Sequence, residues 1–154
     1  MRLSIVIPLL NEAASLAELK AALDAVLPQV GGSAEIVFVD DGSTDGSLEI
    51  LKRFHAAEPD RVKVLSFRRN QGKSAALAAA FQVVRGEFVV TLDADLQDDP
   101  HEVPQLLGAL EQGADLVCGW KRTRKDPWTK RLPSRLFNRI TGMLAVTQAE
   151  PGSA

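Results

Sequence analysis

Two carboxylates separated by one residue, Asp93 and Asp95, follow an apolar run and precede Gln97. Carboxylate and amide oxygens suit Mg²⁺ or Mn²⁺, and both ions keep coordination positions for water and phosphate oxygens. Two close carboxylates also repel each other unless a cation is present. The pattern therefore favours a metal site with a diphosphate co-ligand over a polar turn. The turn is the favoured interpretation for Asp98 and Asp99, which lead into a predicted helix.

A second acidic pair, Asp40 and Asp41, follows another apolar run at 36–39. Acidic side chains in such a position can accept hydrogen bonds from a nucleotide base or a ribose hydroxyl. The alternative is a turn whose side-chain oxygens cap the next helix, an interpretation that suits the neighbouring segment 43–45. Local sequence leaves both interpretations of Asp40 and Asp41 open.

The run Gly72-Lys73-Ser74 is similar to part of a phosphate-binding loop. That loop requires a glycine five residues before the Gly-Lys pair, and Phe67 stands there, so a nucleoside-triphosphatase loop is rejected. What remains is Lys73 in the first turn of a helix, where an anion binds favourably. No Gly-x-Gly-x-x-Gly pattern follows the first predicted strand, which argues against an NAD or FAD domain.

A basic segment lies beyond these motifs, at residues 120–139, interleaved with Trp120, Trp128 and Phe137. From Ser134 onward its apolar residues share one helical face. A basic amphipathic helix with flanking Trp suits a membrane surface or a lipid phosphate. A solvated helix packed on the body by its apolar face is the equally weighted alternative. Nucleic acid is disfavoured, because the acidic body would repel it.

Strands alternate with helices in the elements that must position these residues. Strands are predicted at 3–7 (ended by Pro8), 36–39, 62–65, 88–92 and 116–118, and helices from Asn11, from Ser43 or Asp45, from after Gly72 to about Arg85, and from Glu102 to Gln112. Apolar strands separated by helices predict an α/β protein whose mostly parallel central sheet carries helices on both faces. Ligands bind such sheets at the carboxyl ends of the strands, so the polar residues after each strand should share one edge.

Length and composition bound the remaining choices. The chain has 154 residues, a net charge of −2, one cysteine and two histidines, which predicts a single domain without disulfides or a Cys/His metal site. Charge is uneven: residues 1–117 carry 10 Lys/Arg against 18 Asp/Glu, whereas 118–154 carry 8 against 2. No signal peptide or membrane-spanning run is visible, which predicts a cytoplasmic protein. A peripheral position at the cytoplasmic face of the membrane is compatible with this prediction.

Four motifs in order resemble family 2 glycosyltransferases of the Rossmann-like GT-A fold. They are residues 5–12 (IVIPLLNE), 39–45 (VDDGSTD), 69–73 (RNQGK) and 93–100 (DADLQDDP). The last one resembles the branch that contains dolichol-phosphate mannose synthases and bacterial polyprenyl-phosphate glycosyltransferases. The resemblance covers about residues 3–140.

The resemblance implies a metal-dependent, inverting transfer of a sugar from a UDP- or GDP-sugar to a polyprenyl phosphate such as dolichyl or undecaprenyl phosphate. It implies Asp93, Asp95 and Gln97 as ligands of Mg²⁺ or Mn²⁺, and Asp93, Asp95, Arg122 and Arg135 as catalytic residues. The implied nucleotide site comprises Pro8, Leu9, Asn11, Glu12, Asp40, Asp41, Asn70, Lys73 and Ala94. The implied phosphate-binding residues are Lys121, Arg122, Arg131 and Arg135.

The predicted organisation is a nucleotide-sugar-binding core at 1–119, a basic acceptor-side loop and amphipathic helix at 120–145, and a tail at 146–154. The family usually continues where this chain ends, so a C-terminally truncated form is expected. A non-catalytic nucleotide-sugar or lipid-phosphate binding module is the alternative function. A sugar nucleotidyltransferase would need a Gly-rich signature after the first strand, where Leu9-Leu10-Asn11-Glu12 stands. An open sheet edge could also pair with a second copy of the chain.

Overall fold

A central sheet of four parallel strands organises the computed structural model, which describes residues 1–119. Its strands are β1 (Leu3–Leu9), β2 (Ala34–Asp40), β3 (Val62–Ser66) and β4 (Phe88–Thr91), in the spatial order β3-β2-β1-β4. The chain therefore runs outward from β1 to β3 and then returns to the other side of β1. This reversal places the topological switch point between β1 and β4.

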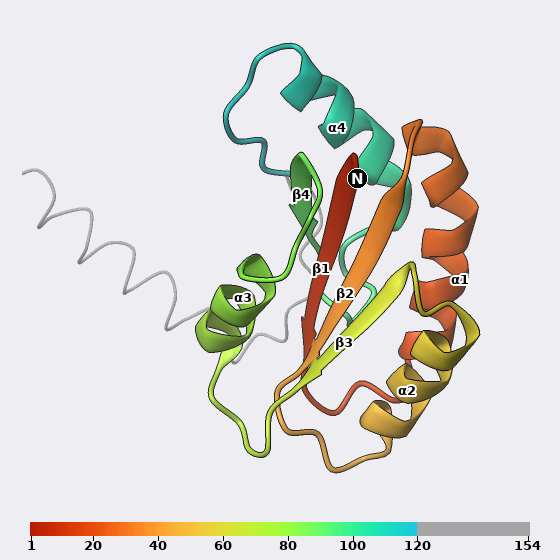
Figure 1. Cartoon of the computed structure of the whole chain (residues 1–154), viewed down its shortest axis with the longest axis vertical. Helices are drawn as coiled ribbons and strands as arrows, with labels where there is room; N and C mark the ends of the chain where they lie inside the picture. The colour runs from red at the N-terminus through yellow and green to blue at the C-terminus, as the bar shows by residue number, and fades with distance from the viewer. Residues whose placement is uncertain (120–154) are drawn as a thin grey trace, which may run out of the picture. The chain divides into compact units, whose positions relative to one another are not determined.

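Helices cover both faces of the sheet, as the sequence predicts (Figure 1). Their bounds are α1 (Leu16–Val26), α2 (Ser47–Ala57), α3 (Lys73–Phe81) and α4 (Val103–Glu111), with two 3₁₀ turns, η1 (Leu27–Val30) and η2 (Pro100–Glu102). Parallel crossovers are right-handed, so α1 and α2, on the outward path, lie on one face. The return path from β3 to β4 places α3 on the opposite face by the same rule.

Alternate residues of β1 divide the core into two layers. Ile5 and Ile7 pack with residues of α1, α2 and α4, whereas Val6 packs against Ala76 and Ala80 of α3. All seven residues of β1 are buried. Ala76 and Ala80 are both fully buried in this second layer.

β1 continues through Pro8 instead of ending there, which corrects the prediction for this strand. The N–H of Leu92 donates to the carbonyl of Val6, and the N–H of Asp41 donates to the carbonyl of Leu9. The backbone N–H and C=O groups of even-numbered residues in β1 therefore point toward β4, and those of odd-numbered residues point toward β2. The missing N–H of Pro8 therefore faces the β4 side, where that strand has already ended at Thr91. Proline costs no ladder hydrogen bond at this position.

Helix starts also differ from the predictions. α1 begins at Leu16, not near Asn11, and α2 begins at Ser47, after the predicted Ser43 or Asp45. The side chains of Asn11 and Ser43 bind a neighbouring loop instead of capping these helices. Asp45 binds that loop too, but it also accepts from the backbone N–H of Ser47, the first residue of α2. The Ala-rich helix ends at Phe81, before Arg85.

No strand forms at 116–118, so the predicted fifth strand is wrong within the residues that the structure describes. Leu116 is 80% exposed, and a three-residue run without a pairing partner gains no ladder hydrogen bonds. Within residues 1–119, no helix is both long and apolar enough to cross a bilayer.

A buried carboxylate, Glu35, fastens the loop before β4 to the sheet. It accepts hydrogen bonds from the Ser4 hydroxyl (2.7 Å) and the Arg85 backbone N–H (2.7 Å), and it pairs with the Lys63 ammonium at 3.0 Å. The Ser4 hydroxyl in turn accepts from the N–H of Gly86 at 2.8 Å. Burial alone would raise the pKa of Glu35, but the hydrogen bonds from Ser4, Lys63 and Arg85 outweigh it and lower the pKa to about 2.

This depressed pKa predicts a loss of stability in acid. Because the folded pKa lies below that of the unfolded chain, the stabilisation is present above pH 4.5 and declines as pH falls toward 2. The shift corresponds to about 3 kcal/mol at neutral pH. Urea unfolding at pH 7 and pH 3 should show that Glu35→Gln is less stable at pH 7 and loses less stability on acidification. An equally steep decline in wild type and variant would contradict the assignment.

Candidate active site

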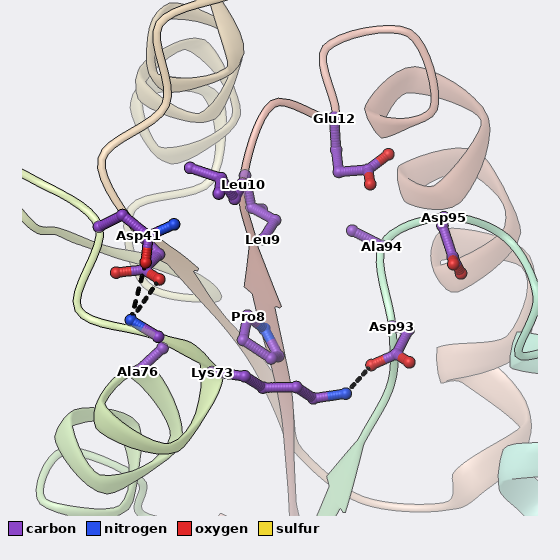
Figure 2. A pocket seen from close by; sticks show the side chains of 12 residues that line it. Pro8, Leu9, Leu10, Glu12, Asp41, Lys73, Ala76, Asp93, Ala94 and Asp95 are labelled. Atoms are coloured by element: carbon purple, nitrogen blue, oxygen red, sulfur yellow. Dashed lines mark hydrogen bonds and ion pairs between the residues drawn. The ribbon is translucent and has the colours of Figure 1, made fainter. Parts of the chain in front are cut away.

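A cavity of about 330 Å³ opens at the carboxyl end of the sheet, by the switch point between β1 and β4. Pro8 and Leu9 come from the end of β1, Asp93 follows β4, and Lys73 and Ala76 belong to α3 (Figure 2). This is the position at which open α/β sheets bind their ligands. The volume lies at the lower end of the range for small-molecule sites.

An ion pair spans the cavity. The Lys73 side chain extends from α3 past Pro8, and its ammonium meets the carboxylate of Asp93 (Figure 2). Lys73 is the first residue of α3, so its charge adds to the positive end of the helix dipole. The ion pair thus links the start of α3 to the segment that follows β4.

The second carboxylate of the Asp93/Asp95 pair is held by its own loop. Asp95 accepts a hydrogen bond from the backbone N–H of Gln97 at 3.1 Å and another from the Gln97 side-chain amide at 2.7 Å. The backbone N–H of Asp93 donates to Asp98 at 2.9 Å. The turn expected for Asp98 therefore supports the segment that presents the two carboxylates.

Asp40 and Asp41 both hold loops, and they differ in access to the cavity. Asp40 accepts from the backbone N–H of Ser43 at 3.0 Å and from the hydroxyl of Ser66 at 3.1 Å, and it does not line the cavity. Asp41 accepts from the N–H groups of Gln71 (2.7 Å) and Gly72 (2.8 Å) and lines the cavity. Asp41 thereby positions the segment that begins α3.

The loops after β1 and β2 are bound together by a set of side-chain acceptors. Three successive N–H groups, those of residues 11, 12 and 13, donate to Ser43, Ser47 and Asp45 at 2.9–3.0 Å. Hydrogen bonds from the Ser47 hydroxyl and the Ala13 N–H lower the pKa of Asp45. Asn11, with φ of 58°, accepts in return from the Thr44 N–H at 2.8 Å. These contacts place Glu12 at the cavity wall.

The structure brings most of the predicted core residues to one cavity. Predicted residues that line it are Pro8, Leu9, Glu12, Asp41, Asn70, Lys73, Asp93, Ala94 and Asp95, whereas Asn11, Asp40 and Gln97 do not. Leu10, Gly72 and Ala76 also line it and were not among the predicted residues. Their positions next to predicted residues, or one helical turn from Lys73, were the available signal. Lys121, Arg122, Arg131 and Arg135, with the predicted segments 120–145 and 146–154, lie outside the described residues.

The carboxylates of the cavity fit a divalent ion that takes part of its coordination from a bound ligand. Within residues 1–119, no group of three His, Cys, Asp or Glu side chains could hold a metal ion by itself. Asp93 and Asp95 nevertheless both line one cavity, and the carboxylate of Asp93 already pairs with the ammonium of Lys73. Mg²⁺ commonly binds through one or two carboxylates, with substrate phosphates and water completing its shell.

The fold and the cavity together define an open parallel α/β protein with a ligand site at its switch point. Comparison with protein families is more specific: the model described as "Glycosyl transferase family 2" matches residues 4–151. The chain belongs to glycosyltransferase family 2.

Two curated relatives carry the name undecaprenyl-phosphate 4-deoxy-4-formamido-L-arabinose transferase. The relative from Pseudomonas paraeruginosa is 46% identical over 137 residues, and that from Aeromonas hydrophila is 40% identical over 136 residues. Each alignment covers 88% of this chain and 40% or 42% of the relative. The chain therefore spans about two fifths of the length of the curated relatives that it matches.

Solved structures of glycosyltransferases share the fold. Glucosyl-3-phosphoglycerate synthase from Mycobacterium tuberculosis, in complex with UDP, has a TM-score of 0.64 and 28% identity, with 93% of this chain and 51% of that chain covered. Mannosyltransferase PcManGT from Pyrobaculum calidifontis, in complex with GDP-Man and Mn²⁺, has a TM-score of 0.58 and 30% identity, with 77% and 34% covered.

Proposed function

We propose that the cavity binds the diphosphate and nucleoside of a nucleotide-sugar together with Mg²⁺ or Mn²⁺, and that the protein transfers the sugar to a polyprenyl phosphate. The observation that carries this proposal is that Asp93, Asp95 and Lys73 line one cavity at the switch point of the sheet, with Lys73 paired to Asp93. Two carboxylates for a metal and one ammonium for an anion suit a metal-bound diphosphate. Glu12, Asp41 and Asn70 line the remainder of the cavity, where the nucleoside would bind.

Support for the two substrates comes from different relatives. The structural neighbours named above were solved with UDP and with GDP-Man, so both nucleotides are candidates for this chain. The curated relatives named above are undecaprenyl-phosphate 4-deoxy-4-formamido-L-arabinose transferases, which supports a polyprenyl-phosphate acceptor. We assign the acceptor phosphate to the basic segment 120–145, whose Lys121, Arg122, Arg131 and Arg135 would also favour contact with an anionic membrane surface on the cytoplasmic side.

The chemistry of this reaction does not require a general base. A lipid phosphate is largely a dianion at neutral pH, so one of its oxygens can attack the anomeric carbon directly. The bond from that carbon to the donor diphosphate breaks, the nucleoside diphosphate leaves, and the configuration at carbon inverts. A divalent ion, when bound, neutralises charge on the departing diphosphate. Lys73 would stabilise the same charge, and the rigid strand ends would align two anions that otherwise repel each other.

Two measurements on the 154-residue chain test the proposal. The melting temperature is measured with UDP or GDP plus Mn²⁺, and one nucleotide is expected to raise it. Incubation with radiolabelled nucleotide-sugars and undecaprenyl phosphate then tests for a labelled lipid product. Stabilisation without product would favour the non-catalytic binding module. The cavity, as the proposed binding site of the nucleotide-sugar donor, is called the donor site. If neither nucleotide stabilises the chain, the proposed donor site is wrong.

A further inference from the structure

The charges around the cavity are unequal. Four carboxylates line it, those of Glu12, Asp41, Asp93 and Asp95, whereas Lys73 is the one cationic side chain among the described lining residues. Asp41 already accepts two backbone hydrogen bonds from the loop before α3. The ammonium of Lys73 forms an ion pair with Asp93, which is one of the two carboxylates that fit a divalent ion.

Lys73 and a divalent ion would compete for Asp93. An ammonium and a divalent cation in contact with the same carboxylate repel each other strongly, because little water separates them. A metal ion that enters the cavity alone must therefore bind beside Lys73 or displace it. A diphosphate changes this balance, because it offers the ammonium a new anionic partner and gives the metal additional oxygen ligands.

The position of Lys73 allows such an exchange. Its side chain is 58% exposed and that of Asp93 is 38% exposed, so the ion pair can separate without opening the packed core. Lys73 also stands in the first turn of α3, where the helix dipole favours an anion. The flexible four-carbon stem of lysine lets the ammonium move while the backbone stays in place.

We propose that Lys73 is an exchangeable counter-cation that makes metal binding depend on the nucleotide. Without a nucleotide, its ammonium neutralises Asp93 and weakens binding of a divalent ion. When a nucleoside diphosphate enters, the ammonium moves to the diphosphate and leaves Asp93 to the metal. This role rests on the proposed donor site and adds a coupling between its two ligands.

The test is a thermodynamic cycle that compares the wild-type chain with Lys73→Met. The Mn²⁺ dissociation constant is measured from the electron paramagnetic resonance signal of free Mn²⁺, with and without saturating UDP or GDP. Lys73→Met is expected to bind Mn²⁺ alone about tenfold more tightly than wild type, since the competing charge is absent. The factor by which the nucleotide tightens Mn²⁺ binding is expected to fall about tenfold, within the usual range of coupling between sites.

Two control variants separate this role from a general effect of charge. Lys52→Met removes an exposed lysine of α2 that pairs with Glu49 and does not line the cavity, so its Mn²⁺ binding should match wild type. Lys73→Arg keeps the positive charge and should retain most of the coupling. Melting temperatures of the variants without ligand establish that each remains folded.

The outcomes distinguish the inference from the proposed function. If Lys73→Met binds Mn²⁺ alone no more tightly than wild type, while wild type binds both ligands, the exchange role is wrong and the donor site stands. If the coupling factor is unchanged in Lys73→Met, the exchange role is also wrong. If wild type binds neither UDP nor GDP in the presence of Mn²⁺, the donor site and the exchange role are both wrong.

Discussion

Replacing Asp93 with Asn is expected to abolish most of the stabilisation that the nucleotide and Mn²⁺ give to the folded chain. Asparagine keeps the size of the side chain but removes the negative charge that a divalent ion needs. A ligand at about 100 times its Kd stabilises a folded protein by about 2.7 kcal/mol, which corresponds to a rise in Tm of roughly 5–10 °C for a chain of this size. We expect Asp93→Asn to retain less than about a third of that rise. Where transfer is measurable, its rate should fall about 10³-fold.

Asp99→Asn is the matched control for this prediction. Asp99 lies in the same acidic motif and does not line the cavity, and its carboxylate accepts from the backbone N–H of His101 at 2.9 Å. That hydrogen bond and the His101 side chain lower the pKa of Asp99, so it is ionised in the same experiment. Asp99→Asn can lower the melting temperature slightly by weakening the cap of η2, but the nucleotide response should match wild type. An unchanged response in Asp93→Asn as well would show that Asp93 is not a ligand of the complex.

Gly42→Ala is expected to destabilise the fold by about 3–5 kcal/mol, through backbone strain and overpacking together. Gly42 has φ of +82°, in the left-handed region that disfavours an L side chain. A Cβ atom at this position would also lie 2.7 Å from the carbonyl carbon of Arg69 and 2.8 Å from the backbone nitrogen of Asn70. These contacts involve backbone atoms, so neither can be relieved by a rotamer change. Urea unfolding measures the loss.

Gly46→Ala separates the two causes. Gly46 has φ of +94°, and nothing lies within 4 Å of its Cβ position. Its substitution therefore adds the strain without the clash and should cost about 1 kcal/mol. If Gly42→Ala is no more destabilising than Gly46→Ala, the close contact between the Gly42 turn and residues 69–70 does not contribute to stability.

The parallel sheet and its two-sided helical cover could be predicted from sequence because each depends on a repeated local pattern. The apolar runs at 3–7 and 36–39 fall within β1 and β2, and the carboxylates after the strands reach one edge because parallel strands end together. The run at 116–118 was equally apolar, and the prediction failed because a strand also requires a partner. That requirement is a property of the tertiary structure.

The supporting contacts of the site could not be predicted in the same way. Asn11, Ser43 and Asp45 are typical helix-capping residues, and local sequence assigned them to caps. In the structure all three bind the facing loop, more than 30 positions away along the chain. Asp45 alone also accepts from the N–H of Ser47 at the start of α2. Asp40 combines a local hydrogen bond from the Ser43 N–H, as the turn interpretation expects, with a distant one from the Ser66 hydroxyl of β3. Each choice between a local and a distant partner depends on which loops the sheet places together.

The hydrogen-bonded connection of the loops after β1 and β2 has a consequence for the entropy of ligand binding. Residues 11–13 lose their conformational freedom when the protein folds, because Ser43, Asp45 and Ser47 hold three successive N–H groups. A ligand that binds against Glu12 therefore does not have to order that wall, and such preorganisation strengthens binding. The hydrogen bonds within segment 93–98 are local, and its ion pair with Lys73 joins two partly exposed side chains. Ordering on ligand binding should therefore fall mainly on that side of the cavity. Hydrogen exchange should accordingly be slow at residues 11–13 before any ligand is added, and ligand-induced protection should be greatest at 93–98.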